Sequence, residues 1–254
     1  KSRSLPGFFY LFIFLIKYLT VMFSIIIPLF NEEKNITSLL DEITYYLKDN
    51  YEYEIVLIND FSNDNTLSVI NRYISKKNIK IINNKKNKGQ SYSIFQGIKN
   101  SSFDTIITID GDGQNNPKDI SSLIDIYKLN NETKLVAGIR LKRKDNLIKI
   151  FSSRIANSIR SKIFNDGCTD TGCSLKIFDK KIFLNFPYFN GIHRFIPSLF
   201  VGYGYSVKFV GVDHRKRTYG NSKYGTFDRL IRGIRDIIIV RNIINNKKKN
   251  DIHS

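Results

Sequence analysis

Apolar runs alternate with amphipathic stretches from residue 23 to residue 140, and this alternation constrains the fold more than any other feature of the chain. The runs "FSIIIPLF" (23–30) and "YEIVLIND" (53–60) lack a polar face, which is typical of strands buried on both sides in a parallel sheet. Between them the sequence predicts a helix whose apolar stripe comprises Ile36, Leu39, Leu40, Ile43 and Leu47. Repeated strand–helix units predict right-handed crossovers, and hence an α/β fold with a mostly parallel central sheet flanked by helices.

The pattern continues along the chain. We expect further strands at 79–84, 104–110, 133–140, 173–178 and 205–215. We expect helices at 63–77, 89–101, 117–130, 145–165 and 226–249. Asp64 or Asn65 is the predicted N-cap of the helix at 63–77, and Pro117 lies in the first turn of the helix at 117–130.

The chain carries 40 Lys and Arg against 23 Asp and Glu, a formal net charge of +17. Such an excess favours an anionic partner: nucleic acid, a phosphorylated substrate or an anionic membrane surface. Nucleic acid is disfavoured because the aromatic residues are not interleaved with basic ones, as a base-stacking surface requires. Cys168 and Cys173 lack the spacing of a zinc site and are expected to be small buried hydrophobes in a reducing compartment.

The N-terminal residues allow several interpretations. The run "FFYLFIFLI" is too short to cross a bilayer, and Lys17 separates it from the next apolar run. A basic start before a short apolar stretch is also typical of a signal-like segment. Met22 is the only methionine, which favours residues 1–21 as an apolar extension that is not native. We therefore expect three parts: the extension 1–21, a globular domain 22–225, and a basic amphipathic helix with a frayed tail at 226–254.

Acidic and amide side chains follow the predicted strand at 104–110. Asp110, Asp112 and Gln114 stand at alternate positions, which point the same way in an extended chain and would present three oxygen ligands to one hard cation. Oxygen ligands are what Mg²⁺ or Mn²⁺ prefer. The alternative is a simple turn, because "DGDGQNNP" is also ordinary turn chemistry.

Five motifs together resemble the inverting family 2 glycosyltransferases with the GT-A (Rossmann-like) fold, and more narrowly their dolichyl-phosphate mannose synthase and bacterial polyprenyl-phosphate glycosyltransferase branch. The motifs are "IIIPLFNEE", "INDFSNDNT", "NKGQSYSIFQGI", "DGDGQNNP" and "HRKRTYGNSKYG", which run from about Phe23 to Tyr224. Two positions depart from the family pattern: Asn59 replaces its first aspartate in the second motif, and Phe61 replaces its glycine. These departures bear on the preferred base more than on the fold.

The resemblance implies a role for each matching residue. The nucleotide-sugar would be bound by Pro28, Asn31, Glu32, Asp60, Asp110, Asp112 and Arg140. A Mg²⁺ or Mn²⁺ ion would be held by Asp110, Asp112 and Gln114. The acceptor phosphate would be bound by Arg194, Arg217 and Lys223. The catalytic groups would be Asp112, Arg217 and Lys223.

The implied activity is metal-dependent transfer of a hexose from a GDP- or UDP-sugar to a dolichyl or undecaprenyl phosphate. Relatives that glycosylate hydroxyls carry a Glu-Asp pair whose Asp is the general base, whereas the corresponding stretch here, "FNGIHRFIPSLF", has no carboxylate. A phosphate acceptor is already ionised and needs positive charge instead of a base. His193 in this stretch remains open between a structural and a functional role. Two alternatives stand: transfer to a glycan or lipid hydroxyl, and a non-catalytic basic module that binds membranes or nucleic acid.

The helix predicted from Thr226 carries an apolar stripe of Phe227, Leu230, Ile231, Ile234 and Ile238 beside several arginines. Residues 214–254 hold eleven Lys or Arg against three Asp. This profile predicts a helix lying in the interface of an anionic leaflet, and thus a peripheral protein on the cytoplasmic face of the inner membrane, with a membrane-protein partner or a homo-oligomer as further expectations. The alternative is a helix packed on the domain with its arginines in water.

Overall fold

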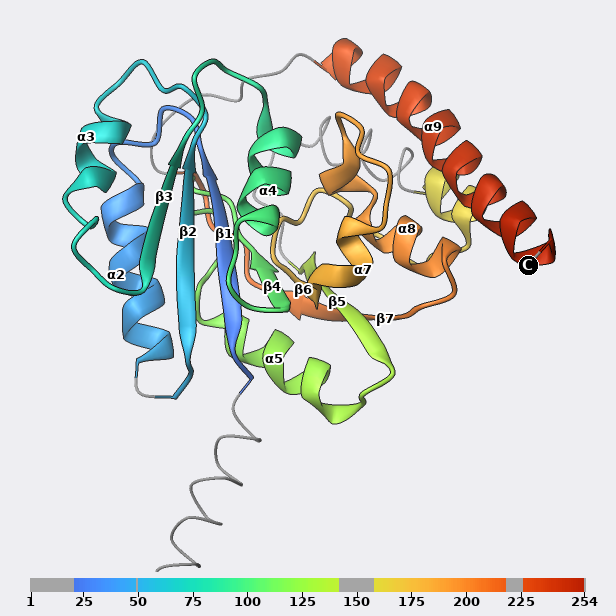
Figure 1. Cartoon of the computed structure of the whole chain (residues 1–254), viewed down its shortest axis with the longest axis horizontal. Helices are drawn as coiled ribbons and strands as arrows, with labels where there is room; N and C mark the ends of the chain where they lie inside the picture. Colours follow the sequence, from blue (N-terminus) through green and yellow to red (C-terminus); the bar gives the residue numbers. More distant parts are fainter. Residues whose placement is uncertain (1–20, 49, 142–157, 218–225, 254) are drawn as a thin grey trace, which may run out of the picture.

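The computed structural model describes residues 21–48, 50–141, 158–217 and 226–253 (Figure 1). Apart from Val21, the predicted extension 1–21 lies outside the described residues, as do 145–157 of one predicted helix and the predicted acceptor residue Lys223. Residues 158–164, the rest of that helix, are helical.

Seven strands form one sheet in the order β3-β2-β1-β4-β6-β5-β7 (Figure 1). The strands are β1 (Phe23–Leu29), β2 (Tyr53–Asn59), β3 (Ile79–Asn83), β4 (Thr105–Thr108), β5 (Thr133–Arg140), β6 (Lys176–Asp179) and β7 (Ser206–Val212). Strands β1 to β4 pair in parallel, and so do β5 and β7. Strand β6 runs antiparallel to both β4 and β5. The predicted α/β class and the mostly parallel sheet are confirmed.

The helices cover both faces of the sheet (Figure 1). They are α2 (Ile36–Leu47), α3 (Thr66–Asn71), α4 (Gln90–Lys99), α5 (Asp119–Leu129), α7 (Lys180–Leu184), the 3-10 turn η1 (Ile192–Arg194), α8 (Ile196–Gly202) and α9 (Thr226–His253). Strand β1 shows why its sequence has no polar side: Ile25 and Ile27 pack among α2, α3 and α5, while Ile26 packs with α4 on the other face.

Some predicted elements were longer than the observed ones, and some were missed. Helix α3 has six residues instead of the predicted 63–77, because only Thr66 and Ile70 among its residues are buried and the following residues form turns. The elements α7, η1 and α8 were not predicted, since helices of a turn or two are too short to show a helical period.

The parallel register brings several strand ends to one edge of the sheet. Leu29 at the end of β1 pairs with Asn59 at the end of β2, and β4 ends beside β1 at Thr108. The segments that follow these strands, "NEE", "NDFSND" and "DGDGQ", therefore lie at the same edge. Their predicted convergence is confirmed.

Among the helices that the structure describes, none combines the length and the apolar character needed to cross a bilayer.

Candidate functional site

The carboxylates of Asp110 and Asp112 lie close together, but not for the predicted reason. The chain turns at 111–112, and Gly113 takes a φ of +71°, so the expected extended conformation is wrong, while cation binding by these side chains stays a prediction. The turn still brings the two acids within electrostatic range. Burial, and then the negative charge of Asp112, raise the pKa of Asp110 from its ordinary value to about 7.

Hydrogen bonds to α4 and to Ser174, which lies just before β6, hold Asp110 in place. Gln90, the first residue of α4, donates from Nε2 to Oδ1 of Asp110 at 2.7 Å. The backbone N–H of Asp110 donates to Oγ of Ser174 at 3.0 Å, and this hydroxyl donates to Oδ1 of Asn115 at 2.7 Å. Sequence reasoning missed Gln90 and Ser174. Only Gln90 could have been found from the sequence, because it lies inside the motif "NKGQSYSIFQGI".

Asp112 is paired with Arg217. One carboxylate oxygen accepts from Nη2 of Arg217, and the other accepts from the backbone N–H of Gln114 at 3.1 Å. The acidic loop also contacts the basic segment at 214–217. The backbones of Asn115 and His214 form an isolated antiparallel β-bridge, and Nε2 of Gln114 donates to the carbonyl of Arg215 at 3.3 Å. Arg217, predicted for the acceptor phosphate, therefore lies on the acidic pair itself.

The acidic pair fits a divalent cation. Asp110 and Asp112 lie within electrostatic range of each other, and Arg217 places a positive charge on Asp112. A nearby cation would favour the charged form of both carboxyl groups. Within the described residues no group of three or more His, Cys, Asp and Glu side chains gathers in a metal-binding arrangement. When a protein supplies only two carboxylates, Mg²⁺ or Mn²⁺ completes its coordination with waters and substrate phosphates. Gln114 as a third ligand stays a prediction.

A close approach of the backbone places this loop against β1. A Cβ atom on Gly111 would lie 2.4 Å from Cδ2 of Leu29 and 3.3 Å from the carbonyl oxygen of Pro28. Only glycine permits this contact between the acidic loop and the end of β1.

Asp60 is held within the protein. Its carboxylate accepts from Nδ2 of Asn84 at 2.8 Å, from the N–H of Lys88 at 2.9 Å and from the N–H of Gly89 at 2.7 Å. These bonds shape the turn that leads into α4 and to Gln90. In this structure Asp60 thus shapes the site through that turn, and its predicted contact with the nucleotide stays a prediction.

Asn31 and Glu32 join the loop after β1 to the loop after β2. Oδ1 of Asn31 accepts from the N–H of Asn63 at 2.9 Å, and the N–H of Glu32 donates to Oγ1 of Thr66 at 2.8 Å. Together with Pro28 in β1, the predicted nucleotide residues lie at one edge of the sheet, and their binding roles remain predictions.

Phe61 takes a left-handed φ of +61° and is 55% exposed. The resembling motif has glycine at this position, so the chain keeps the backbone shape that glycine favours while carrying a bulky side chain.

Arg140 forms a bidentate ion pair with Asp170, through Nε at 2.7 Å and Nη2 at 2.7 Å. Its predicted phosphate contact is untested, and in this structure both of these donors serve Asp170.

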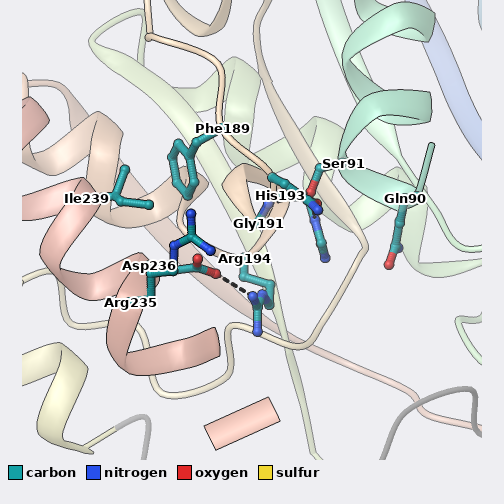
Figure 2. A pocket seen from close by; sticks show the side chains of 11 residues that line it. Gln90, Ser91, Phe189, Gly191, His193, Arg194, Arg235, Asp236 and Ile239 are labelled. Atoms are coloured by element: carbon teal, nitrogen blue, oxygen red, sulfur yellow. Dashed lines mark hydrogen bonds and ion pairs between the residues drawn. The ribbon is translucent and has the colours of Figure 1, made fainter. Parts of the chain in front are cut away.

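A cavity of about 640 Å³ opens between α4, η1 and α9 (Figure 2). Its lining includes Gln90, Ser91, Phe189, Gly191, His193, Arg194, Arg235, Asp236 and Ile239. A smaller cavity of about 120 Å³ lies beside it, lined by Asp110 and Lys176 among others, and the two share Gln90, His193 and Arg194 as walls. Asp110 of the acidic pair therefore lines a cavity that adjoins the one lined by Arg194 of η1 and Arg235 of α9.

His193 is a neutral, hydrogen-bonded wall of both cavities. Its Nδ1 lies 2.7 Å from Oγ of Ser91. Burial, and then the positive charges of Arg194 and Lys176, lower its pKa from 6.5 to about 3. Lys176, which is 3% exposed and lies near both Asp110 and His193, was another residue that sequence reasoning missed. With its pKa lowered to about 3, His193 is uncharged near neutral pH.

Arg194 lies in the larger cavity, where its Nη2 pairs with Asp236 of α9 (Figure 2). Arg235 lines the same cavity. Arg194 and Asp110 thus line the same smaller cavity. Lys223 lies outside the described residues.

A family model described as glycosyl transferase family 2 matches residues 24–186. The chain is 33% identical over 223 residues to the dodecaprenyl-phosphate galacturonate synthase of Rhizobium johnstonii, covering 85% of this chain and 65% of that protein. It is 31% identical over 218 residues to the undecaprenyl-phosphate 4-deoxy-4-formamido-L-arabinose transferase of Pseudomonas fluorescens, covering 85% of this chain and 63% of that protein. The chain thus spans slightly less than two thirds of the length of these relatives.

The fold is similar to that of glucosyl-3-phosphoglycerate synthase from Mycobacterium tuberculosis. The structure of that protein with Mn²⁺, UDP-glucose and phosphoglyceric acid matches with a TM-score of 0.68 and 14% identity, covering 94% of this chain and 83% of the other. The structure of the same protein with Mg²⁺ and UDP gives a TM-score of 0.65, 14% identity and the same two coverages. At this level of identity the likeness shows a shared fold.

Proposed function

Because the chain belongs to glycosyl transferase family 2, we propose that it transfers a hexose from a GDP- or UDP-sugar to a polyprenyl phosphate, with inversion at the sugar. Two relatives are named as enzymes that act on dodecaprenyl or undecaprenyl phosphate, which supports this acceptor class. In the proposed reaction a phosphate oxygen of the acceptor forms a bond to the sugar's C1. The bond from C1 to the nucleoside diphosphate breaks, and its electron pair leaves with the diphosphate.

The observation that carries the proposal is the pair of cavities that relates Asp110 to Arg194 and Arg235. The smaller cavity carries Asp110, which suits a cation with a diphosphate, beside Lys176. The larger cavity carries Arg194 and Arg235, which suit an anionic acceptor. Among the described lining residues of the larger cavity, the one carboxylate is Asp236, and it is engaged by Arg194. This arrangement favours an acceptor that needs positive charge over a hydroxyl that needs a base.

Asp110 and Asp112 would hold Mg²⁺ or Mn²⁺, which supplies Lewis-acid stabilisation of the departing diphosphate. Structures of the similar glucosyl-3-phosphoglycerate synthase that contain Mn²⁺ or Mg²⁺ with UDP support this assignment. Arg217, now on Asp112, would add positive charge beside the same diphosphate. The bidentate fork of an arginine such as Arg194 is well matched to a phosphate.

We further propose that the protein is peripheral at the cytoplasmic face of the inner membrane. Helix α9 packs on the domain through Val240 and Ile244, yet Ile234 and Ile238 are 55% and 57% exposed on the same helix. The exposed Arg235 lies beside them. An apolar pair beside a basic residue supports contact with an anionic leaflet, where a polyprenyl phosphate resides.

The deciding experiment is transfer from a panel of UDP- and GDP-sugars to undecaprenyl phosphate, with Mn²⁺ or with chelator. We expect a glycosyl phospholipid product that depends on the divalent ion. Full transfer in chelator would contradict the metal-dependent mechanism. Transfer to a hydroxyl acceptor in place of the lipid phosphate would replace the proposed acceptor class.

A further inference from the structure

Helix α9 reaches into the larger cavity with a carboxylate. Asp236 is 4% exposed and pairs with Nη2 of Arg194 across 42 residues of sequence (Figure 2). A carboxylate in a cavity proposed to bind an anion would repel that anion unless the carboxylate is paired with a neighbouring cation. The ion pair identifies that neighbour as Arg194.

The protein backbone is shaped around this carboxylate. Gly191 takes a φ of +123°, and a Cβ atom there would lie 2.3 Å from Oδ2 of Asp236 and 3.3 Å from Nη2 of Arg194. The N–H of Gly191 donates to Oγ of Ser91 at 2.8 Å, which fixes the start of η1 against α4. The glycine therefore makes room for Asp236 in a position where any side chain would displace it.

Arg194 keeps donors to spare after pairing with Asp236. Its side chain is 31% exposed, and its Nε is a buried atom with no partner among the described residues. A guanidinium has five N–H donors, so one carboxylate leaves most of them for a ligand. A free arginine side chain loses rotamer entropy when a ligand fixes it, and a partner that fixes the side chain beforehand removes that cost from ligand binding.

We propose that Asp236 is a positioning residue: it holds Arg194 ready for the phosphate of the acceptor, so that α9 completes the acceptor site. The proposal rests on the polyprenyl phosphate acceptor proposed above. It goes beyond it by making a residue of the C-terminal helix responsible for acceptor affinity. The same helix exposes Ile234 and Ile238, so contact with the membrane and the position of Arg194 depend on one element.

The first test compares Asp236→Asn with the wild type in two assays on the full chain. The variant is expected to raise the KM for undecaprenyl phosphate about tenfold and leave the KM for the sugar nucleotide unchanged, a loss of about 1.4 kcal/mol on the acceptor side alone. Calorimetric binding of farnesyl phosphate, which needs no turnover, should weaken by a similar factor. Asp125→Asn makes the same change on an exposed carboxylate of α5 and should alter neither value.

The second test is non-additivity. If Asp236 acts through Arg194, the double variant Arg194→Gln/Asp236→Asn should bind farnesyl phosphate no more weakly than Arg194→Gln alone. Additive losses would overturn the proposal. Asp236→Glu keeps the charge but displaces it by one methylene and should fall between Asp236→Asn and the wild type; if Asp236→Asn does not fold in a thermal melt, this variant carries the same comparison.

Each further outcome decides a different statement. Unchanged acceptor binding in a folded Asp236→Asn or Asp236→Glu would overturn the positioning role while leaving the proposed function intact. A large fall in kcat with normal acceptor binding would also overturn it, and would make Asp236 a general base for a hydroxyl acceptor. If the wild type neither binds farnesyl phosphate nor glycosylates undecaprenyl phosphate, the proposed function fails and this inference falls with it.

Discussion

At the scale of single residues, the acidic pair shows how the fold neutralises charge before any ligand arrives. Asp110 accepts from Gln90, and Asp112 accepts from Arg217, so each carboxylate has a partner that a cation would have to join or replace. Burial, and then the charge of Asp112, raise the pKa of Asp110, so the charged form of this carboxyl group is still disfavoured. The site therefore keeps a capacity for positive charge.

Replacing Asp112 by Asn should abolish divalent-ion-dependent transfer, because the site loses one of its two carboxylates and Arg217 loses its partner. We expect at least about a hundredfold loss of kcat/KM, in the range found when one group that stabilises transition-state charge is removed. The measurement is transfer rate together with calorimetric Mn²⁺ binding. Asp213→Asn, an exposed acid near the same edge, is the control and should bind Mn²⁺ normally; Mn²⁺ binding to Asp112→Asn as tight as to the wild type would contradict the assignment.

His193 should make stability depend on pH. Its pKa in the folded protein, about 3, lies below the ordinary value of 6.5, so the unfolded chain takes up a proton that the folded chain excludes. Its contribution is complete above pH 6.5 and is lost as the pH falls toward 3. Relative to His193→Gln, the wild type should lose up to about 1.4 kcal/mol of unfolding free energy per pH unit below about pH 6. Urea unfolding across this range checks it, and parallel curves for the two proteins would refute it.

At the scale of elements, α9 has two apolar sides, one buried against the domain and one exposed. Val240 and Ile244 pack into the core cluster that includes α8, and a Cβ on Gly202 of α8 would lie 2.4 Å from Cδ1 of Ile244. Ile238 faces outward. The predicted stripe comprised Phe227, Leu230, Ile231, Ile234 and Ile238. Ile234 and Ile238 are exposed, and the side chains of the other three lie outside the described residues. The packed alternative holds for the inner side of α9.

This difference predicts unequal effects of the same substitution. Ile244→Ala should destabilise the docking of α9 by about 2 to 5 kcal/mol, because it removes a buried side chain from a tight contact. Ile238→Ala on the same helix should change stability by no more than about 0.5 kcal/mol. Hydrogen exchange of the α9 amides measures both. Equal exchange rates in the two variants would mean that α9 does not depend on its contact with α8.

At the scale of the whole molecule, the two cavities lie between Asp110, which follows β4, and helix α9. The parallel strands bring the acidic loop and the residues predicted to bind the nucleotide to one edge. Helix α9 adds a wall from the far end of the sequence. The outward side of this wall is the proposed membrane contact.

The membrane proposal predicts a specific loss. Ile234→Asp/Ile238→Asp should bind less to vesicles that contain anionic lipid, because it removes exposed apolar side chains and adds negative charge. Vesicle flotation measures binding, which should also weaken as salt rises. The matched control is Leu129→Asp, which changes an 83% exposed apolar residue at the end of α5. If the Ile234→Asp/Ile238→Asp variant floats with the vesicles as well as the Leu129→Asp control does, the membrane contact lies elsewhere.

The sequence by itself determined the class of fold, because local periodicity depends on which face of an element is buried. The run at β1 is apolar at every position but Ser24 and Pro28, and this pattern follows from helices that cover both faces of the sheet. The strand ends could be predicted to converge for the same reason, since the carboxyl ends of parallel strands share an edge. The acidic pair at Asp110 and Asp112 was found because its residues are neighbours in the chain.

Only the tertiary structure decided which side chains meet across the site. Arg217 pairs with Asp112 over 105 residues, and Asp236 pairs with Arg194 over 42. Such pairs leave no local pattern, because their geometry depends on how whole elements pack and not on the residues beside them. The sequence therefore identifies which side chains can carry charge. The packing of α9 and of the segment at 214–217 determines which oppositely charged side chain each one contacts.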